Sequence, residues 1–377
     1  MGFLTPYLRR KERILMKTIV EGKARILTGD AFYNPKMAML RDMSVMFLKA
    51  VRTRNMRVLD STAATGVRAI RYALEAGTKN VTLIDINKKA AAVAKKNVKL
   101  NGLKLKVMNE SVQGLANEHE GSFEAIDHDP FGSPAPNMFD LMKLAWNGTN
   151  LMITATDTAV LCGAHAGACI KVYGSRPLHN EMCKEAGLRI LLNFTARTAA
   201  QFNFGMMPLL SISDMHYMRV FVRLEFGADK SIASMKNTGI GAFCSKCYEY
   251  MFEKGVAPLL GPLCPKCKSK MEPFGPIWLG SMRDRDTIMK MRKNSISDAA
   301  SEKMDLLYEE LDVPMFYSVP KLTKRLGVTS VSHYAVMEKL QETGARVTRT
   351  QFDPNGFKTD ASIEEVFASV RAAGRRK

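Results

Sequence analysis

The chain is 377 residues long, which exceeds one ordinary hydrophobic core, so we expect two domains and a small insert. Apolar residues make up 46% and charged residues 24%, as is normal for a soluble globular protein. The N-terminal residues lack the pattern of a signal peptide. The most apolar long window, residues 151–170, carries Asp157 and His165, which argues against a membrane span. These features predict a cytoplasmic protein that does not bind membranes.

The formal net charge of +18 is more than a fold requires, and a polyanionic partner would use it. Basic residues cluster in four places: Arg9, Arg10, Lys11 and Arg13; Lys266, Lys268 and Lys270; Arg283 and Arg285; and Arg375, Arg376 and Lys377. A solvated surface explains any one cluster, but their spread along the chain favours nucleic acid as the partner. No basic helix has a strongly apolar opposite face, and nothing in the sequence indicates an obligatory protein partner.

Strands and helices are predicted to alternate through the first part of the chain. After a loop-like segment up to residue 35, apolar residues at helical spacing indicate a helix over 37–51. Strands are expected at 57–60, 80–85, 105–108, 123–127, 150–154, 207–213 and 217–225. The helices between them are expected at 66–76, 88–100, 138–146 and 181–200. This order predicts an α/β fold, a Rossmann-like sheet of seven strands with helices on both faces.

Acidic residues follow three of these strands. Asp60 ends the first strand, Asp85 ends the second, and Asp129 comes just after the fourth. A single aspartate at such a place is usually a turn former or a helix cap. Parallel sheets, however, bind ligands beyond the carboxyl ends of their strands, so three successive aspartates indicate a ligand site at this edge. We interpret Asp127 as a strand-end residue that points away and leave it outside the site.

The turn after the first strand, residues 60–66, has the position of a dinucleotide-binding loop but only one glycine. Small Ala, Ser and Thr residues suffice to line the methionine part of S-adenosylmethionine, which has no phosphate. Asp85 is placed to accept the two ribose hydroxyls, and residues 109–112 are placed to contact adenine. These residues indicate a nucleoside-binding domain in which Asp60 begins the cofactor loop.

The segment Asp129-Pro-Phe-Gly suits methyl transfer to an exocyclic amine of a base. A carboxylate that accepts the amine N–H bonds, helped by the carbonyl of Pro130, favours a lone pair that faces the methyl donor. The Phe131 ring can stack on a base taken out of its helix. The same residues are ordinary turn chemistry, and composition alone leaves both interpretations open. The position after the fourth strand favours the active site.

The surrounding sequence resembles the tRNA (guanine-N2)-dimethyltransferase family, class I S-adenosylmethionine-dependent enzymes that modify guanosine 26 of tRNA. The resemblance runs from about residue 20 to the end. It rests on motifs at 32–37, 64–68, 127–134, 154–165, 173–178 and 348–359. It implies that Asp129 is the catalytic carboxylate and that Phe131 and Phe32 flank the guanine. It also implies a cofactor pocket lined by Arg41, Arg68, Asp85, Ser111 and Val112. Ser111 and Lys36 stand where the family usually has an acidic residue and an arginine.

Four of the seven cysteines have the spacing of a zinc ribbon. Cys244 and Cys247 form one Cys-x2-Cys pair, and Cys264 and Cys267 form a second one after 16 intervening residues. Each pair can lie on one turn, and a hairpin between them brings the pairs together. Four thiolates leave no open coordination position, so the Zn²⁺ is expected to be structural. The remaining three, Cys162, Cys169 and Cys183, are interpreted as buried thiols.

Beyond residue 300 the sequence predicts a winged-helix-like module. A helix over 304–311, a turn with Gly327, a helix over 330–343 and a strand over 345–350 follow one another. The RNA major groove is too narrow for the second helix, so the module would contact the backbone and shape of RNA. A small helical packing module is the alternative. We expect a catalytic domain over 1–235 and an α+β, tRNA-binding domain over 236–377, with the ribbon at 240–275 and the winged-helix-like part at 298–352.

The leading hypothesis is a tRNA guanine-N2 methyltransferase that adds one and then a second methyl group from S-adenosylmethionine. One alternative is a methyltransferase for another exocyclic amine, in ribosomal RNA or DNA. Another is a zinc-ribbon and winged-helix protein that binds RNA without catalysis. No cysteine lies in the loop after the fourth strand, so methyl transfer is expected to be direct, from sulfur to nitrogen.

Overall fold

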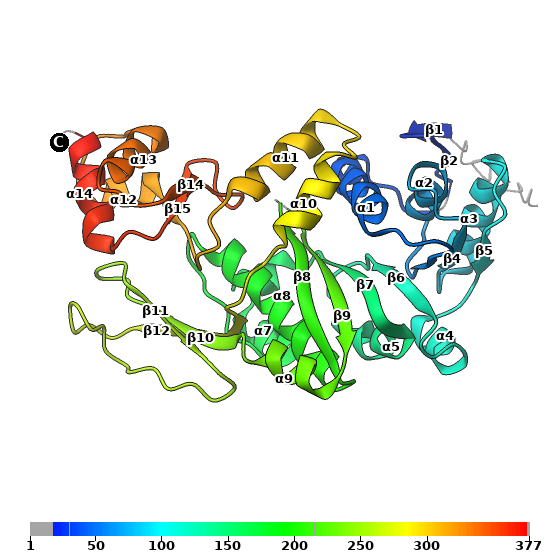
Figure 1. The fold of residues 1–377 in the computed structure, drawn as a ribbon, viewed down its shortest axis with the longest axis horizontal. Helices are drawn as coiled ribbons and strands as arrows, with labels where there is room; N and C mark the ends of the chain where they lie inside the picture. The colour runs from blue at the N-terminus through cyan, green and yellow to red at the C-terminus, as the bar shows by residue number, and fades with distance from the viewer. Residues whose placement is uncertain (1–17, 30, 215, 375–377) are drawn as a thin grey trace, which may run out of the picture.

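The computed structural model describes residues 18–29, 31–214 and 216–374 (Figure 1). Two of the basic clusters lie outside the described residues: Arg9, Arg10, Lys11 and Arg13, and Arg375, Arg376 and Lys377. Within the described part of the chain, no helix is long and apolar enough to cross a membrane.

Seven strands form one sheet in the order β5-β4-β3-β6-β7-β9-β8. The strands are β3 (Arg57–Asp60), β4 (Asn80–Ile84), β5 (Lys106–Met108), β6 (Phe123–His128), β7 (Ala145–Ala155), β8 (Phe204–Ser213) and β9 (Met218–Phe226). The strands from β5 to β7 are parallel, whereas β9 is antiparallel to both β7 and β8. The predicted seven-stranded α/β fold is therefore confirmed.

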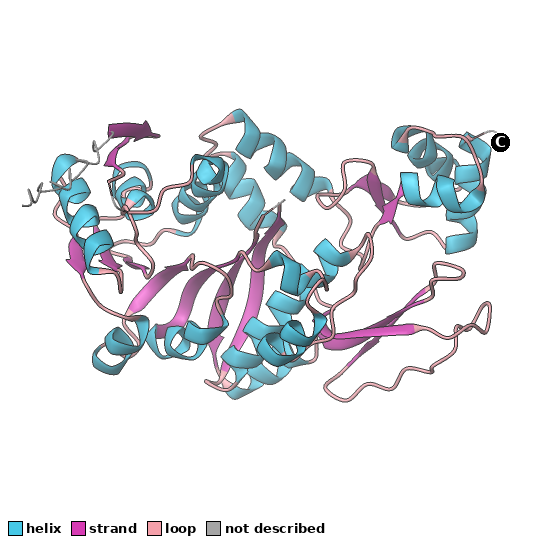
Figure 2. Cartoon of the chain, turned by 180° about the vertical axis from the view of Figure 1, so that it is seen from behind, coloured by secondary structure: helices cyan, strands magenta, loops and turns pink. Residues whose placement is uncertain are grey.

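Helices cover both faces of this sheet (Figures 1 and 2). One face packs on α1 (Ala38–Val51), α2 (Val67–Glu75) and α3 (Lys88–Leu100). The other packs on α4 (Val112–Glu118), α5 (Met138–Leu144) and α8 (Cys183–Ala200). Val58 and Leu59, adjacent in β3, are fully buried in these two different cores, as the alternation of side chains along a strand requires. The short helices η1 (Pro35–Met37), η2 (Ala135–Asn137), α6 (Thr158–Leu161) and α7 (Ala166–Tyr173) lie in the connections.

Several elements differ from the sequence prediction, three of them as follows. Residues expected to be loop-like form a hairpin of β1 (Thr18–Glu21) and β2 (Ala24–Leu27), whose strands are too short to give a clear period. The helix expected over 138–146 ends at Leu144, because Ala145 already pairs with Phe123 of β6. The short helix α4 was not predicted, although Ser111 caps it through its hydroxyl oxygen.

A smaller sheet of three antiparallel strands follows α9 (Ala228–Met235). It has the order β11-β10-β12, made of β10 (Thr238–Phe243), β11 (Tyr250–Lys254) and β12 (Glu272–Trp278). Phe274, Ile277 and Trp278 of β12 are buried in the same core as α8. This small sheet is therefore anchored on the large one.

Two helices, α10 (Arg285–Arg292) and α11 (Asp298–Glu309), pack beside α1 on the outer face of the large sheet (Figure 1). The rest of the chain forms a module with its own core. It comprises β13 (Tyr317–Ser318), α12 (Val319–Leu326), α13 (His333–Glu342), β14 (Val347–Arg349), β15 (Gly356–Thr359) and α14 (Ile363–Ala373). The turn at Gly327, the helix expected over 330–343 and the strand expected over 345–350 are present, the last two as α13 and β14. The helix α12, which ends just before Gly327, was not predicted. The helix expected over 304–311 is α11, which packs on α1 and not in the core of the module.

Candidate active site

The carboxyl ends of β3, β4 and β6 meet at one edge of the large sheet. Asp60 at the end of β3 is in register with Leu83 of β4 on one side and with Asp127 of β6 on the other. The order of strands along the chain reverses between β3 and β6, which is where open α/β sheets bind ligands. The three strand-end aspartates singled out from the sequence therefore lie at the expected ligand edge.

Asp129 is held by an arginine on the adjacent helix. The guanidinium of Arg68, in α2, donates from Nε to Asp129 Oδ2 at 3.1 Å and from Nη2 to the same oxygen. Asp129 Oδ1 is buried and has no hydrogen-bond partner among the described residues. Burial alone would raise the pKa of Asp129, but the charges of Arg68 and then Arg219 outweigh burial and hold that pKa below its ordinary value. The site thus holds an ionised carboxylate whose Oδ1 has no partner within hydrogen-bond distance, although the Thr154 hydroxyl also helps to lower the Asp129 pKa.

Asp127 lies beneath this pair and is not exposed at the strand end. It is fully buried, and both of its oxygens accept from Arg219 Nη2 at 2.9 Å. Its Oδ2 also accepts from the Tyr72 hydroxyl and lies 3.8 Å from Arg68 Nη1. Arg219 in turn donates to Thr154 Oγ1 at 2.5 Å. Asp127 is therefore a buried support under Arg68, a position that the sequence did not indicate.

His128 separates the two aspartates but does not join the site chemistry. It is fully buried, and its ring nitrogens contact Ser61 Oγ at 2.9 Å and Asn137 Nδ2 at 3.4 Å. Burial lowers the pKa of His128 to about 4, so its ring is neutral near pH 7. Asp129 is therefore the candidate acid–base group of this loop.

The loop that follows Asp129 is fixed by threonines on two other loops. The backbone N–H of Asp129 donates to Thr62 Oγ1 at 3.0 Å. The N–H of Gly132 donates to Thr156 Oγ1 at 2.7 Å, and the N–H of Thr156 donates to the Gly132 carbonyl at 2.9 Å. Gly132 has a φ of +78°, which a side chain would strain. Asp129-Pro-Phe-Gly is therefore a tight turn, as one interpretation of the sequence had it, and this turn fixes the orientation of the Asp129 carboxylate.

Phe131 and Phe32 meet at the surface in front of this loop. Their ring centroids are 4.5 Å apart and the ring planes make an angle of 79°, an edge-to-face pair. Phe131 is 74% exposed and Phe32 is 50% exposed. Water-exposed phenyl rings next to a buried carboxylate are typical of a surface that a flat aromatic ligand covers.

The cofactor loop, residues 60–66, is joined to β4 through Asp85. Asp85 Oδ2 accepts the N–H of Ala64 and Oδ1 accepts the N–H of Asn87, both at 2.8 Å. Each of these Asp85 oxygens has a second lone pair that can accept another hydrogen bond, so the carboxylate could bind the two hydroxyls of a ribose. Gly66 has a φ of +77°, and a Cβ there would lie 3.1 Å from Leu83 Cδ2, which explains the one glycine of this loop.

Asp60 is the unusual group of this loop. It is 1% exposed and its Oδ2 has no hydrogen-bond partner among the described residues. Burial, followed by repulsion from Asp127, raises the pKa of Asp60 to about 7. A cationic ligand group near Asp60 would favour its ionised form, so this carboxyl fits the sulfonium or ammonium group of S-adenosylmethionine.

Three other residues expected in the cofactor pocket have structural partners. Arg41 is buried and donates from Nε to Glu21 Oε1 at 2.6 Å, which ties α1 to the β1–β2 hairpin. Ser111 caps α4 by accepting the N–H of Gly114 at 2.9 Å. Val112 is 5% exposed and belongs to the core. Their contact with a cofactor stays a prediction, as does that of Arg68, which faces Asp129.

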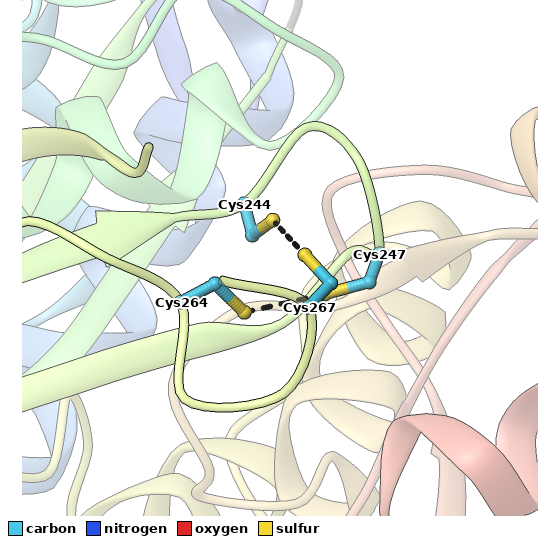
Figure 3. A group of neighbouring side chains, drawn as sticks. All are labelled: Cys244, Cys247, Cys264 and Cys267. Atoms are coloured by element: carbon cyan, nitrogen blue, oxygen red, sulfur yellow. Dashed lines mark hydrogen bonds between the residues drawn. The ribbon is translucent and has the colours of Figure 1, made fainter. Parts of the chain in front are cut away.

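The four cysteines of the expected zinc ribbon come together (Figure 3). Their Sγ atoms all lie within 4.8 Å of one another, with Cys244 and Cys267 at 3.4 Å and Cys247 and Cys264 at 3.4 Å. The two turns share one hydrogen-bond pattern. In the first, the N–H of Tyr248 donates to the Cys244 carbonyl at 2.8 Å, and in the second, the N–H of Lys268 donates to the Cys264 carbonyl at 3.0 Å. Zn–S bonds of about 2.3 Å would put tetrahedral sulfurs a little under 4 Å apart, so the cluster fits a closed, structural zinc site.

Sequence reasoning missed the supporting residues of the site. Thr62, Thr156, Tyr72 and Arg219 lie on four different elements, and no local pattern joins them. The strand that carries Arg219 also carries Arg223 and Glu225, so the sequence did not single out Arg219 as the buried guanidinium that requires an anionic partner.

Comparisons with known proteins agree with this geometry. A family model described as N2,N2-dimethylguanosine tRNA methyltransferase matches residues 15–371. A "tRNA (guanine(26)-N(2))-dimethyltransferase" of Methanothermobacter thermautotrophicus is 36% identical, over 93% of this chain and 97% of that protein. One of Pyrococcus abyssi is 35% identical, over 95% and 99%. A solved structure of Trm1 from Pyrococcus horikoshii with S-adenosyl-L-methionine is 34% identical, with a TM-score of 0.86 over 94% of this chain and 99% of that one. The chain belongs to the N2,N2-dimethylguanosine tRNA methyltransferase family.

Proposed function

We propose that this protein transfers methyl groups from S-adenosylmethionine to the N2 amine of guanosine 26 in tRNA, first one and then a second. The observation that carries the proposal is the ionised Asp129, which has a free oxygen and lies beside two exposed phenyl rings. The relatives that match the chain over nearly its whole length bear the name of this reaction.

Asp129 would act on the guanine amine through its free oxygen. Oδ1 would accept an N–H of the amine while Arg68 holds Oδ2, and the Pro130 carbonyl would accept the other N–H. These bonds turn the nitrogen lone pair out of conjugation with the base and toward the methyl group. The N–C bond forms as the C–S bond breaks, and the amine proton leaves through Asp129 to water. Bound S-adenosylmethionine supplies the electrophilic methyl group.

The guanine would enter between Phe131 and Phe32. The two rings now touch edge to face, so one of them has to turn before a base can stack on its face. Both rings are largely exposed, which makes such a turn inexpensive. Arg41, Arg68, Asp60, Asp85, Ser111 and Val112 would line the cofactor pocket.

The remaining parts of the chain would serve substrate binding. We assign catalysis to residues 1–235 and tRNA binding to residues 236–377, with the ribbon at 240–275 and the winged-helix-like part at 298–352. The cysteine cluster would hold structural Zn²⁺. A cytoplasmic location suits four thiols that must stay reduced to bind it.

Nucleoside mass spectrometry tests the proposal directly. Unmodified tRNA transcript is incubated with enzyme and S-adenosylmethionine, in parallel with a transcript in which guanosine 26 is replaced by adenosine. We expect N2,N2-dimethylguanosine only in the first, and none with Asp129→Ala. Methylation of ribosomal RNA or DNA in place of tRNA would overturn the substrate. Full activity of Asp129→Ala would overturn the assigned centre.

A further inference from the structure

A groove lies between the helix pair α10–α11 and the C-terminal module, outside the catalytic site. It has a volume of about 440 Å³. Its walls include Arg285 of α10, Tyr308 and Glu309 of α11, Tyr334 of α13 and Arg349 of β14. Neither the cofactor loop nor the cysteine cluster contributes to it, so its side chains need another explanation.

Two tyrosine rings, Tyr308 and Tyr334, and two arginines, Arg285 and Arg349, are among the residues that line this groove. The Tyr308 ring has the guanidinium carbons of Arg285 and Arg292 at 5.7 and 5.4 Å from its centroid. Tyr334, in the first turn of α13, is 58% exposed, and its ring centroid lies 4.1 Å from that of His333. A flat, exposed ring beside guanidinium groups is the combination that binds unpaired bases and their phosphates.

The charged residues that line the groove are two arginines, Arg285 and Arg349, and one acid, Glu309, which leaves a small positive excess. Helix α10 and the residue after it are basic, with Arg285, Lys290, Arg292 and Lys293 against Asp286, whereas α11 is acidic, with Asp298, Glu302, Asp305 and Glu309 against Lys303. Arg292 is paired with Asp305 at 2.5 Å, whereas Arg349 is 4.0 Å from Glu309, a loose and exposed contact. Arg285 and Arg349 on the groove walls therefore remain available to phosphates.

The two sides of the groove are joined to each other and to the catalytic domain. The N–H of Leu311, just after α11, donates to Thr348 Oγ1 of β14 at 2.9 Å. Ser297, just before α11, donates to Asp42 of α1 at 2.8 Å. Helix α1 begins a few residues after Phe32, and α10–α11 lie between α1 and the module in both views (Figures 1 and 2). An RNA that places a base at Phe32 and Phe131 can therefore continue along this helix layer to the groove.

We propose that this groove binds an unpaired nucleotide of the substrate tRNA, at a distance from the guanosine that is methylated. The base stacks on Tyr334, and the flanking phosphates pair with Arg285 and Arg349. The proposal rests on the proposed function for the identity of the RNA. An acidic protein segment would use the arginines but has no need of the exposed Tyr334 ring, so RNA accounts for more of the groove.

Binding and turnover of single variants test the groove. The dissociation constant for tRNA transcript is measured by fluorescence anisotropy, and dimethylguanosine formation by mass spectrometry. Loss of one stacked base corresponds to about 5- to 150-fold weaker binding, which is expected for Tyr334→Ala, while Tyr334→Phe keeps the ring and the affinity. Arg285→Ala should reduce the slope of log Kd against log salt by about 0.7–0.9. S-adenosylmethionine affinity should stay unchanged in all three.

Two matched controls lie elsewhere on the surface. Phe226→Ala removes a 60% exposed ring at the end of β9, and Lys95→Ala removes an exposed charge on α3. Unchanged tRNA affinity in Tyr334→Ala, or an equal loss in Phe226→Ala, would overturn the groove and favour a protein segment as its occupant. If Tyr334→Ala weakens tRNA binding but the wild type forms no dimethylguanosine, the groove stands and the proposed function fails. If the wild type forms dimethylguanosine but Tyr334→Ala binds tRNA unchanged, the function stands and the groove fails.

Discussion

Replacement of Arg68 by methionine would isolate what the guanidinium does for Asp129. Methionine keeps much of the length and the apolar stem of the side chain but removes its charge. Asp129 then keeps one nearby cation, Arg219, while Asp127 and Asp60 remain beneath it. Because Arg68 now holds the Asp129 pKa down, its loss should raise that pKa, and the acid limb of the activity profile should move toward neutral pH.

The size of the effect follows from the distance and the burial. At 3.1 Å and an effective dielectric constant of about 20, two unit charges attract by roughly 5 kcal/mol. Arg68 and Asp129 have side chains that are only 6% and 16% exposed, so solvent screens little of this. Loss of one partner of a buried pair typically costs about 3–5 kcal/mol of stability. The variant should therefore be both less stable and less active at neutral pH than the wild type.

Two measurements separate the electrostatic role from a general loss of structure. The pH dependence of kcat/KM for tRNA methylation is compared in wild type, Arg68→Met and Arg68→Lys, and urea unfolding is followed for each. Arg57→Met serves as the control, because its pair with Glu124 is partly exposed and should be worth under about 1 kcal/mol. The reasoning is wrong if Arg68→Met keeps the wild-type pH profile, or if it destabilises no more than Arg57→Met.

Three further changes give independent predictions. Because the folded chain keeps the Asp60 proton up to a pKa of about 7, whereas the unfolded chain loses it near 3.8, this group makes stability fall as pH rises between those values. The amide introduced by Asp60→Asn cannot titrate. The free energy of unfolding of this variant, measured with urea, should therefore exceed that of the wild type by an amount that grows across this pH interval to at most about 4 kcal/mol. A difference that does not depend on pH would contradict this prediction. Phe131→Ala, at a 74% exposed position, should leave the melting temperature within about 2 °C but lower kcat/KM for tRNA about 5- to 150-fold, and a wild-type kcat/KM would exclude stacking. Purified protein should contain one equivalent of zinc by plasma mass spectrometry. The variant Cys264→Ser should lose this zinc, and its melting temperature should fall by several degrees. Zinc retained by this variant would refute binding by four thiolates.

The sequence predicted the parts of the fold that have a regular period. The helix over Lys88–Leu100 was predicted to the residue, because Asn87 caps it and Asn101-Gly102 ends it. The hairpin β1–β2 was missed because its four-residue strands are too short to show a period, and its packing on the rest of the chain depends on distant partners. Leu27, for example, donates its N–H to Asn97 Oδ1 at 2.8 Å, across the whole of β3 and β4 in the sequence. Such contacts have no local signature.

The candidate site shows the same difference between local patterns, which the sequence reveals, and contacts between distant residues, which it does not. The position of Asp60, Asp85 and Asp129 at one edge of the sheet could be predicted, because strand ends are visible in the sequence and parallel strands align their ends. The cysteines were found from spacing alone. The arginines that pair with Asp129 and Asp127 could not be predicted, because the partners are far apart in the sequence. Arg68 and Asp129 are separated by 61 positions, and Arg219 and Asp127 by 92.

Asp60 ends β3, Asp127 lies near the end of β6 and Asp129 follows β6, yet the structure gives these three aspartates different partners. Asp129 has Arg68 and stays ionised, whereas Asp127 takes both oxygens to Arg219 and adds the Tyr72 hydroxyl. Two guanidiniums cannot neutralise three buried carboxylates, and Asp60, with no partner for Oδ2, is the one whose pKa rises to about 7. The raised pKa keeps a proton on Asp60 below about pH 7, next to the loop over residues 60–66. In the cofactor site that we propose, a sulfonium ion near Asp60 would supply a positive charge and favour release of that proton.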